Sequence, residues 1–238
     1  MEKTAEIQLE SLSFTLIRRS TRRTVALSVK SDNRIVVLAP YFASASSVIA
    51  FVKRSEPWVQ KRITANTVKT AQIPVLHYVA GDIVHYLGRP YELVEGTLAT
   101  LRMKDTTIII PNTSASEIHR KLNRWYKTRA ADIFLDRLSL YEPRVGQQHA
   151  KLRLSSAKTR WGSCTTTGTI SLRWTLIMAP LSVIDYVVVH ELCHLVHMDH
   201  SRSFWKLVKS IYPDYHAAVQ WLKLHGQTLA LPNPKKML

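Results

Sequence analysis

Four of the ten histidines in this 238-residue chain lie between residues 190 and 200, which read His-Glu-Leu-Cys-His-Leu-Val-His-Met-Asp-His. On an α-helix, residues four apart lie about 40° apart around the axis and one turn along it, so His190 and His194 can bind one metal ion. A tetrahedral catalytic zinc takes three protein ligands and leaves its fourth position to water. Glu191, next to the first ligand, can reach that water as a general base. The pattern predicts a hydrolase with one zinc ion per chain.

The third ligand is either His197 or His200. If the helix continues, His197 stands one heptad beyond His190, which is roughly 10 Å along the axis. Zinc–nitrogen bonds are about 2.0–2.1 Å long, so a single ion can hardly reach both side chains. His200 follows Asp199, a residue type that tolerates the left-handed backbone a chain reversal requires. We expect His200 to be the third ligand and His197 to lie beside the site, with His197 kept as the alternative ligand.

The segments on either side of the histidines favour helices. Residues 183–189 are apolar enough to form a buried helix, and Pro180 stands just before them. After the histidines, Ser201 is a candidate N-cap for a second helix. The apolar face of that second helix comprises Phe204, Trp205, Leu207 and Val208. A bare HExxH pattern occurs by chance, but these flanks give it the context of a metal site.

Hydrolysis of this kind usually needs a further donor for the developing oxyanion. The candidate donors are Arg160, His197, Tyr212 and Tyr215. Each of them could instead serve packing or surface charge. Trp161 is expected in the core or in a wall of the site.

The chain carries a formal net charge of +16 and has a pI near 10.1. Positive charges cluster at Arg18-Arg19, at Arg22-Arg23 and between Arg120 and Arg129. Such fields attract nucleic acids, nucleotides and other polyanions. A solvated basic surface explains the charge equally well, so nucleic acid and nucleotides stay as candidate partners only.

Composition indicates a compact protein of the cytoplasm. The hydrophobic content of 46% supplies a sizeable core. No apolar run reaches the roughly eighteen residues of a membrane span, and the amino terminus lacks the apolar region of a signal peptide. The two cysteines, Cys164 and Cys193, suit a reducing compartment. Cys193, inside the HExxH motif, is expected to pack in the core. No oligomeric state follows from the sequence.

Short strands dominate the first half of the chain. Three segments near the N-terminus are expected to form strands, 14–17, 25–29 and 35–38. The turn between the last two is expected at Asp32-Asn33. A helix capped by Ser46 or Ser47 should extend to about Lys61, with a kink or break at Pro57. Four later segments also have strand character: 83–87, 90–94, 98–103 and 106–110.

A long helix is expected to begin near Ser114 and to end at Pro143 and Gly146. Its predicted buried stripe comprises Ile118, Leu122, Trp125, Tyr126, Ala130, Ile133, Phe134 and Leu138. Residues 151–175 alternate as strands. The last helix should extend from about Tyr215 to Leu224, before a Pro/Lys-rich tail that is expected to be disordered.

The break near 111–113 suggests two domains. We expect a β-rich N-terminal module with one helix over residues 1–112 and a catalytic domain over residues 113–238. A single interleaved domain is equally consistent with the pattern.

Several motifs in combination resemble one known family. They are Arg160-Trp161-Gly162-Ser163-Cys164, Ile170–Trp174, Val183–His194, His200-Ser201 and Phe204-Trp205. Together they are far more specific than HExxH alone, and they resemble the YgjP-like metallopeptidase family over most of the chain. That family is similar to the SprT-like and WLM zinc peptidases, some of which act on DNA-bound proteins.

The resemblance implies zinc ligands at His190, His194 and His200, with Glu191 as the catalytic acid/base. It also places Trp161-Gly162-Ser163 in a strand or turn near the zinc helix, which makes Trp161 and Ser163 candidate contacts of the ligands or the substrate. We expect an α+β fold in which the β-rich N-terminal module precedes a zincin-like catalytic domain. The HExxH helix of that domain should pack against a small sheet.

Three functions are compatible with the sequence. The leading one is a zinc metallopeptidase that acts on a peptide or protein substrate and is associated with nucleic acid. The second is a metal-dependent nucleoside triphosphate phosphohydrolase of the pyrophosphatase type, against which the chain has neither a GxxxxGK[ST] loop nor a carboxylate cluster for magnesium. The third is a nucleic-acid-binding protein with a metal site. Glu191 argues against it, because a structural zinc site uses four protein ligands and no general base.

Overall fold

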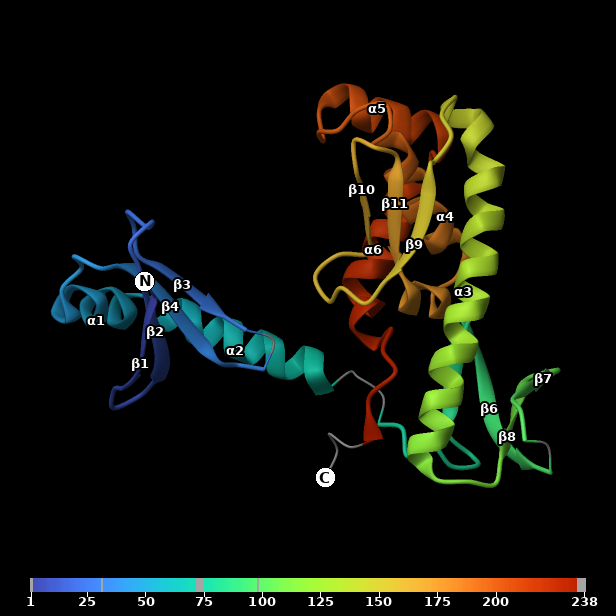
Figure 1. Cartoon of the computed structure of the whole chain (residues 1–238), viewed down its shortest axis with the longest axis horizontal. Helices are drawn as coiled ribbons and strands as arrows, with labels where there is room; N and C mark the ends of the chain where they lie inside the picture. The colour runs from blue at the N-terminus through green and yellow to red at the C-terminus, as the bar shows by residue number, and fades with distance from the viewer. Residues whose placement is uncertain (1, 31, 72–74, 98, 235–238) are drawn as a thin grey trace. The chain divides into compact units, whose positions relative to one another are not determined.

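The computed structural model describes residues 2–30, 32–71, 75–97 and 99–234 (Figure 1). By its internal contacts the chain divides into two compact units, Met1–Gln72 and Ile73–Leu238, here called the N-terminal unit and the C-terminal unit. Each unit combines helices with small sheets, so the expected α+β class is confirmed.

The N-terminal unit is built from β1 (Glu2–Gln8), β2 (Ser13–Arg19), β3 (Ala26–Val29), β4 (Ile35–Pro40), α1 (Ala45–Arg54) and α2 (Glu56–Ala71). The strand order is β1-β2-β4-β3, in which β2 and β4 are parallel and the other pairs antiparallel. Phe14, Leu16 and Val37 lie at alternating strand positions and share a core with Val48 and Val52 of α1.

The three strands expected in this unit are present, and Asn33 takes the left-handed conformation (φ 63°) in the turn that joins two of them. β1 was not expected, because its residues 3–6 are exposed polar or small side chains without alternation. The expected cap at Ser46 or Ser47 was wrong: the side chain of Ser44 accepts the Ser47 N–H (3.1 Å), so α1 begins two residues earlier.

The C-terminal unit begins with a sheet of β5 (Ile83–Tyr86), β6 (Arg89–Gly96), β7 (Arg102–Lys104) and β8 (Thr107–Pro111), in the order β5-β6-β8-β7. A second sheet, in the order β10-β11-β9, is formed by β9 (Lys151–Ser155), β10 (Gly162–Cys164) and β11 (Thr169–Arg173). The helical elements are α3 (Ala115–Val145), η1 (Trp174–Met178), α4 (Leu181–Cys193), α5 (Arg202–Ile211), α6 (Tyr215–His225) and η2 (Gly226–Thr228). The strand expected over 98–103 is observed at Arg102–Lys104, and residue 98 lies outside the described residues.

The long helix α3 has the ends that the sequence predicts. The Ser114 side chain accepts the N–H of Glu117 (3.3 Å), and Gly146 ends the helix in the left-handed conformation (φ 74°). The fully buried stripe of α3 comprises Ile118, Leu122, Tyr126, Ala130, Phe134, Leu138 and Tyr141, and the predicted Trp125 and Ile133 are partly buried.

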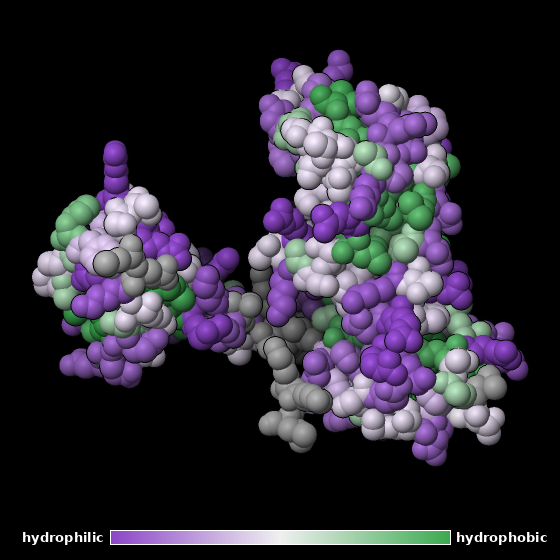
Figure 2. All heavy atoms as spheres, viewed as in Figure 1, coloured by the Kyte–Doolittle hydropathy of each residue, from purple (hydrophilic) through white to green (hydrophobic). Residues whose placement is uncertain are grey.

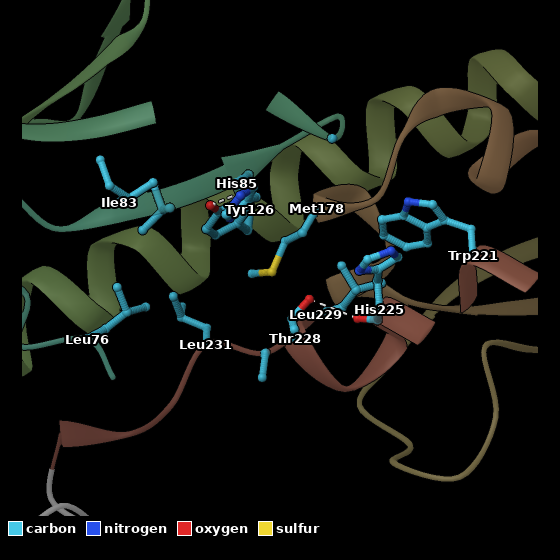
Figure 3. A pocket seen from close by; sticks show the side chains of 13 residues that line it. Leu76, Ile83, His85, Tyr126, Met178, Trp221, His225, Thr228, Leu229 and Leu231 are labelled. Carbon is cyan, nitrogen blue, oxygen red and sulfur yellow. Dashed lines mark hydrogen bonds between the residues drawn. The ribbon is translucent and has the colours of Figure 1, made fainter. Parts of the chain in front are cut away.

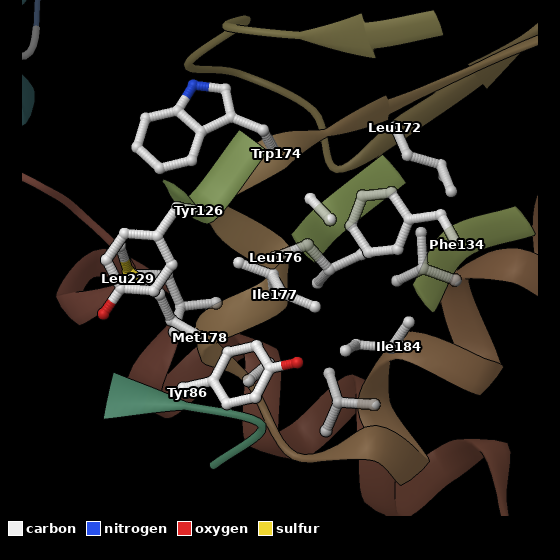
Figure 4. Close-up of a cluster of buried hydrophobic side chains, with 14 of the residues drawn as sticks. Tyr86, Tyr126, Phe134, Leu172, Trp174, Leu176, Ile177, Met178, Ile184 and Leu229 are labelled. Carbon is white, nitrogen blue, oxygen red and sulfur yellow. The ribbon is translucent and has the colours of Figure 1, made fainter. Parts of the chain in front are cut away.

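Helix α4, which carries the HExxH motif, is buried on nearly all sides. Its side chains Val183, Ile184 and Val187 to Val189 share one core with α3, η1 and both sheets of the unit. Figure 4 shows Ile184 in this core with Phe134 of α3 and Ile177 of η1. Asp185 forms a two-pronged ion pair with Arg137 of α3, at 2.5 and 2.9 Å. Packing and this ion pair together fix the position of α4.

The boundary between the units differs from the one expected near 111–113. Leu93 and Ile108 of the first sheet share a core with Leu122 of α3, so this sheet belongs to the C-terminal unit. The N-terminal unit is correspondingly shorter and has two helices, because the chain breaks at Ser55, just before Pro57.

The segment after α6 also packs against the C-terminal unit. Arg173 donates to the Leu229 carbonyl (3.1 Å), and the hydroxyl of Tyr78 donates to the Pro232 carbonyl. The expected disorder of the tail therefore does not extend over residues 226–234, and residues 235–238 lie outside the described range. Much of the face in Figure 2 is hydrophilic, as the high charge of the chain predicts.

Candidate active site

The two helical histidines lie at the end of α4. The helix ends at Cys193, and His194 is its C-cap with a helical backbone (φ −68°, ψ −18°), so His190 and His194 keep the relation expected one turn apart. Tight turns follow at once, in which the N–H of His197 donates to the Cys193 carbonyl (3.0 Å). The chain then reaches His200, next to Ser201, which caps α5.

Three imidazoles converge at this place. One ring nitrogen from each of His190, His194 and His200 lies within 4.8 Å of the other two. The Nε2 atoms of His190 and His200 are 3.1 Å apart. This spacing allows a single ion of zinc size to contact all three nitrogens.

The side chain of His197 is not in this group. Its main-chain carbonyl instead contacts Nδ1 of His194 at 3.0 Å. A neutral imidazole that donates from Nδ1 presents Nε2 as its acceptor, so this contact directs Nε2 of His194 toward the other two rings. The α-helix has already ended before residue 197, so the 10 Å separation expected on a continuous helix does not arise.

A phenylalanine supports all three rings. Phe204 of α5 is fully buried, and its ring centroid lies 5.0, 4.5 and 4.9 Å from those of His190, His194 and His200. Trp205 adds a second contact to His190 and to His200. The sequence predicts both aromatic residues as one apolar helix face, and the structure shows that this face lies against the imidazoles.

Glu191 lies beside the imidazoles and against β10. Only 5% of its surface is exposed. A Cβ atom added to Gly162 would come within 2.5 Å of its Oε1, so only glycine leaves room for the carboxyl group there. Burial raises the pKa of Glu191 to about 8, and the Arg160 guanidinium opposes this shift. Its Oε2 is buried without a hydrogen-bond partner in the described part of the chain.

Burial favours the uncharged form of His190 and His194, the form that metal ligands require. Burial lowers the pKa of His190 to about 3 and also lowers that of His194. Three converging imidazoles beside a buried carboxyl group with an unpartnered oxygen are a donor set that suits zinc. The residues present therefore fit a metal centre.

A cavity of about 350 Å³ opens on Glu191 and His190, here called the active-site pocket. Its lining consists of Arg160, Trp161, Gly162, Tyr186, Val187, His190, Glu191, Val219, Leu222 and Lys223. Trp161 is fixed as a wall, because Arg173 stacks on its ring at 4.6 Å and Gly226 lies against its edge. A second cavity, of about 260 Å³ between β5, η1 and the segment after α6, contains none of the three clustered histidines (Figure 3).

Of the other residues that the sequence suggested for the site, some line the active-site pocket and some do not. Arg160 and Trp161 line the active-site pocket. Tyr215 does not line it but stacks between Trp205 and Tyr186, at centroid distances of 5.5 and 6.3 Å. The hydroxyl of Tyr212 donates to the Ser182 carbonyl (2.9 Å) in the first turn of α4, so it is used at the other end of the helix.

Ser163 is in β10, between Gly162 and Cys164. Successive side chains of a strand point to opposite faces. Since the Cβ direction of Gly162 meets Glu191, the side chain of Ser163 lies on the sheet face away from α4. The expected contact of this segment with the helix is thus made by Gly162.

Tyr186, Val219, Leu222 and Lys223 are among the lining residues that were not singled out as site residues from the sequence. Tyr186 lies four residues before His190 on the same helix, and this continuation of the i, i+4 spacing was a usable signal. Leu222 and Lys223 of α6 carried no comparable signal, because they reach the pocket only through the tertiary packing of α6 on α4.

Comparison with known proteins agrees with this geometry. The family model described as YgjP-like, metallopeptidase domain matches residues 23–225. The chain belongs to the YgjP-like metallopeptidase family. The matched range includes residues of both units, all three clustered histidines and Glu191.

Other comparisons add little to the YgjP-like assignment. A solved structure of the metallopeptidase zymogen of Pyrococcus abyssi abylysin is similar at 24% identity, over 40% of this chain and 93% of that chain, with a TM-score of 0.35. At that score the family assignment rests on the family model alone. A search of the curated proteins gave no match.

This YgjP-like chain is a metallopeptidase-like hydrolase, and the family implies a metal, for which the three clustered histidines are the candidate ligands. None of its helices, within the residues described, has the length and apolar character needed to cross a membrane.

Proposed function

We propose that this chain is a zinc-dependent peptidase in which His190, His194 and His200 hold one zinc ion and Glu191 is the general acid/base. The observation that supports this most directly is the convergence of three ring nitrogens within 4.8 Å beside a buried carboxyl group. Burial favours the neutral form of His190 and His194, and Phe204 and the His197 carbonyl limit how the rings can turn.

When bound there, zinc lowers the pKa of a coordinated water and polarises the substrate carbonyl. The role of Glu191 follows from its surroundings. With zinc bound beside it, the Glu191 carboxylate would accept the proton of the attacking water and return it to the leaving amine. Its unpartnered Oε2 is the atom that we assign to this proton transfer.

A peptide substrate suits the strand next to Glu191. β10 is an edge strand of its sheet. Trp161 and Thr165 bond across to β11, through Arg173 N–H to Trp161 C=O at 2.7 Å and Thr165 N–H to Thr169 C=O at 3.0 Å. In an antiparallel ladder the residues that alternate with these, here Gly162 and Cys164, direct their N–H and C=O groups to the open edge. Gly162 and Cys164 can therefore pair with an extended peptide beside the carboxyl group.

The oxyanion donor that we propose is Tyr186, in place of the four candidates named from the sequence. It lines the active-site pocket together with His190 and Glu191. Burial raises the pKa of its hydroxyl to about 12, so the group stays protonated and can donate. Tyr212 already donates elsewhere, and Tyr215 lies behind Tyr186.

We also propose a location in the cell and a partner for this chain. The free thiols of Cys164 and Cys193 suit the cytoplasm. Association with nucleic acid is supported only by the net charge of +16.

A phosphohydrolase acting on nucleoside triphosphates remains the alternative reaction. The same water could attack phosphorus, and Arg160 and Lys223 could hold phosphate.

One set of measurements tests the centre and the reaction together. Metal content is measured by mass spectrometry for the wild type, His200→Ala and Glu191→Gln, and each protein is assayed on casein, with and without DNA, and on nucleoside triphosphates. We expect about one zinc per chain, lost in His200→Ala and kept in Glu191→Gln, with casein cleavage lost in both variants. Cleavage of triphosphates alone would replace the peptidase by the phosphohydrolase. Retention of metal in His200→Ala would contradict the ligand set.

A further inference from the structure

Two cations line the active-site pocket without a role in the proposed proton transfer. Arg160 lies next to Trp161 on the β10 side, and Lys223 lies in the last turn of α6. Glu191 is the single acidic residue in the lining. Apart from these charges, the walls are mainly apolar or aromatic, formed by Trp161, Val187, Val219 and Leu222.

Neither cation is held in an ion pair with another described residue, although Arg160 lies close enough to Glu191 to oppose the rise of its pKa. Both side chains are exposed, and within the described ranges neither forms a salt bridge with Asp or Glu. Arg173 provides a contrast, because it stacks on Trp161 and donates to the Leu229 carbonyl. Arg173 therefore builds the wall, whereas Arg160 and Lys223 remain available to a ligand.

The position of the pocket determines which part of a substrate would enter it. A peptide paired with the edge of β10 passes Gly162, which lies at one side of the pocket and directly against Glu191. A residue beside the cleaved bond would thus place its side chain in a space of about 350 Å³. The apolar walls suit methylene groups, and the two cations suit a carboxylate.

We propose that the active-site pocket selects an acidic side chain, Glu or Asp, beside the cleaved peptide bond, and that Arg160 and Lys223 determine this specificity. The inference rests on the proposed peptidase function. Two cations outweigh the single carboxyl group of Glu191, and they disfavour Lys or Arg in the pocket by repulsion.

A charge reversal at one of the two cations tests the selection. Matched peptide pools with Glu, Gln or Lys on either side of the cleaved bond are digested by the zinc-loaded wild type, by Lys223→Glu and by Lys209→Glu. Lys209 is a control of equal charge change, because it is exposed on α5 and does not line the pocket. We expect the wild type and Lys209→Glu to favour Glu over Gln by roughly tenfold in kcat/KM, and Lys223→Glu to favour Lys.

Ionic strength provides a second criterion. The preference for Glu should shrink between about 0.05 and 1 M salt, because exposed charges are screened within about 3 Å at 1 M. Equal cleavage of the Glu and Gln pools, or an unchanged preference in Lys223→Glu, would overturn the specificity while leaving the peptidase function in place.

A binding measurement separates failure of the specificity from failure of the function. Zinc-loaded Glu191→Gln, with and without Lys223→Glu, is titrated calorimetrically with one peptide that carries a central Glu and with its Gln counterpart. Tighter binding of the Glu peptide that is lost on charge reversal supports the pocket even if no peptide is cleaved. Equal affinities for the two peptides would overturn the proposal whatever the enzyme hydrolyses.

Discussion

The carboxyl group of Glu191 rests on the backbone of Gly162, where an added Cβ atom would come within 2.5 Å of Oε1. The contact joins the helix that carries HExxH to the edge strand of the small sheet. The position of the proposed general base therefore depends on the absence of a side chain at residue 162.

Gly162→Ala should reduce kcat by about 100-fold or more with metal content unchanged, because Glu191 must move while the histidines do not. Ser163→Ala is the matched control, since that side chain lies on the other face of the strand. Both variants are compared for peptide cleavage and for zinc content. Full activity in Gly162→Ala would show that the contact does not position the base.

His197→Ala should keep its zinc, because the group that contacts His194 is the main-chain carbonyl of residue 197. His200→Ala should lose it, because one of three ring nitrogens is removed. Metal content after dialysis against a weak chelator distinguishes the two. Loss of zinc in His197→Ala together with retention in His200→Ala would exchange their roles.

Phe204→Ala should weaken zinc binding as well as stability, because the ring contacts all three imidazoles. Loss of a fully buried Phe costs about 3–5 kcal/mol of unfolding free energy. Phe134→Ala is the control, since Phe134 is equally buried in the same unit but makes none of these ring contacts. We expect similar destabilisation of the two metal-free proteins but a loss of zinc affinity for Phe204→Ala alone.

Tyr186→Phe should lower kcat by about 10- to 1000-fold with little change in KM, because the hydroxyl is assigned to the transition state. Removing only the oxygen leaves the ring in its stack with Tyr215. Steady-state kinetics on a cleaved peptide measure both constants. A rise in KM at constant kcat would make Tyr186 a binding residue instead.

The metal-free protein should lose stability as the pH rises from 6.5 to 8. The folded-state pKa of Glu191 is about 8, above its ordinary value of 4.5, so the folded state binds a proton that the unfolded state has released. The unfolding free energy then falls by up to about 1.4 kcal/mol per pH unit. His190 and His194, whose pKa values are lowered, oppose this fall near pH 6.5, where the unfolded state still protonates them in part, so Glu191→Gln, which keeps both, is the reference. Urea unfolding of the wild type and of Glu191→Gln measures the difference, and equal slopes would remove Glu191 as its cause.

Elements could be predicted from the sequence where their own residues mark the ends, by capping side chains or glycine, or where the spacing of residues is periodic. Ser114 and Gly146 mark both ends of α3 by side-chain capping and left-handed geometry. Ser201 does the same for the start of α5. The HExxH spacing, with His200 after it, identified all three clustered histidines because their geometry depends on one helix turn and one short reversal.

Features that depend on tertiary packing were not accessible in this way. β1 is a strand only through its pairing with β2, and its own residues do not alternate. The boundary between the units was displaced because the first sheet of the C-terminal unit gains its core from α3. Lys223 reaches the active-site pocket only because α6 packs on α4.

Helix α6 follows the histidines in the chain, and its residues Val219, Leu222 and Lys223 form one side of the active-site pocket. The three clustered histidines all precede this helix, on α4 and just before α5. A substitution on the inner side of α6 can therefore reshape one wall of the pocket while the elements that carry the histidines keep their own sequence.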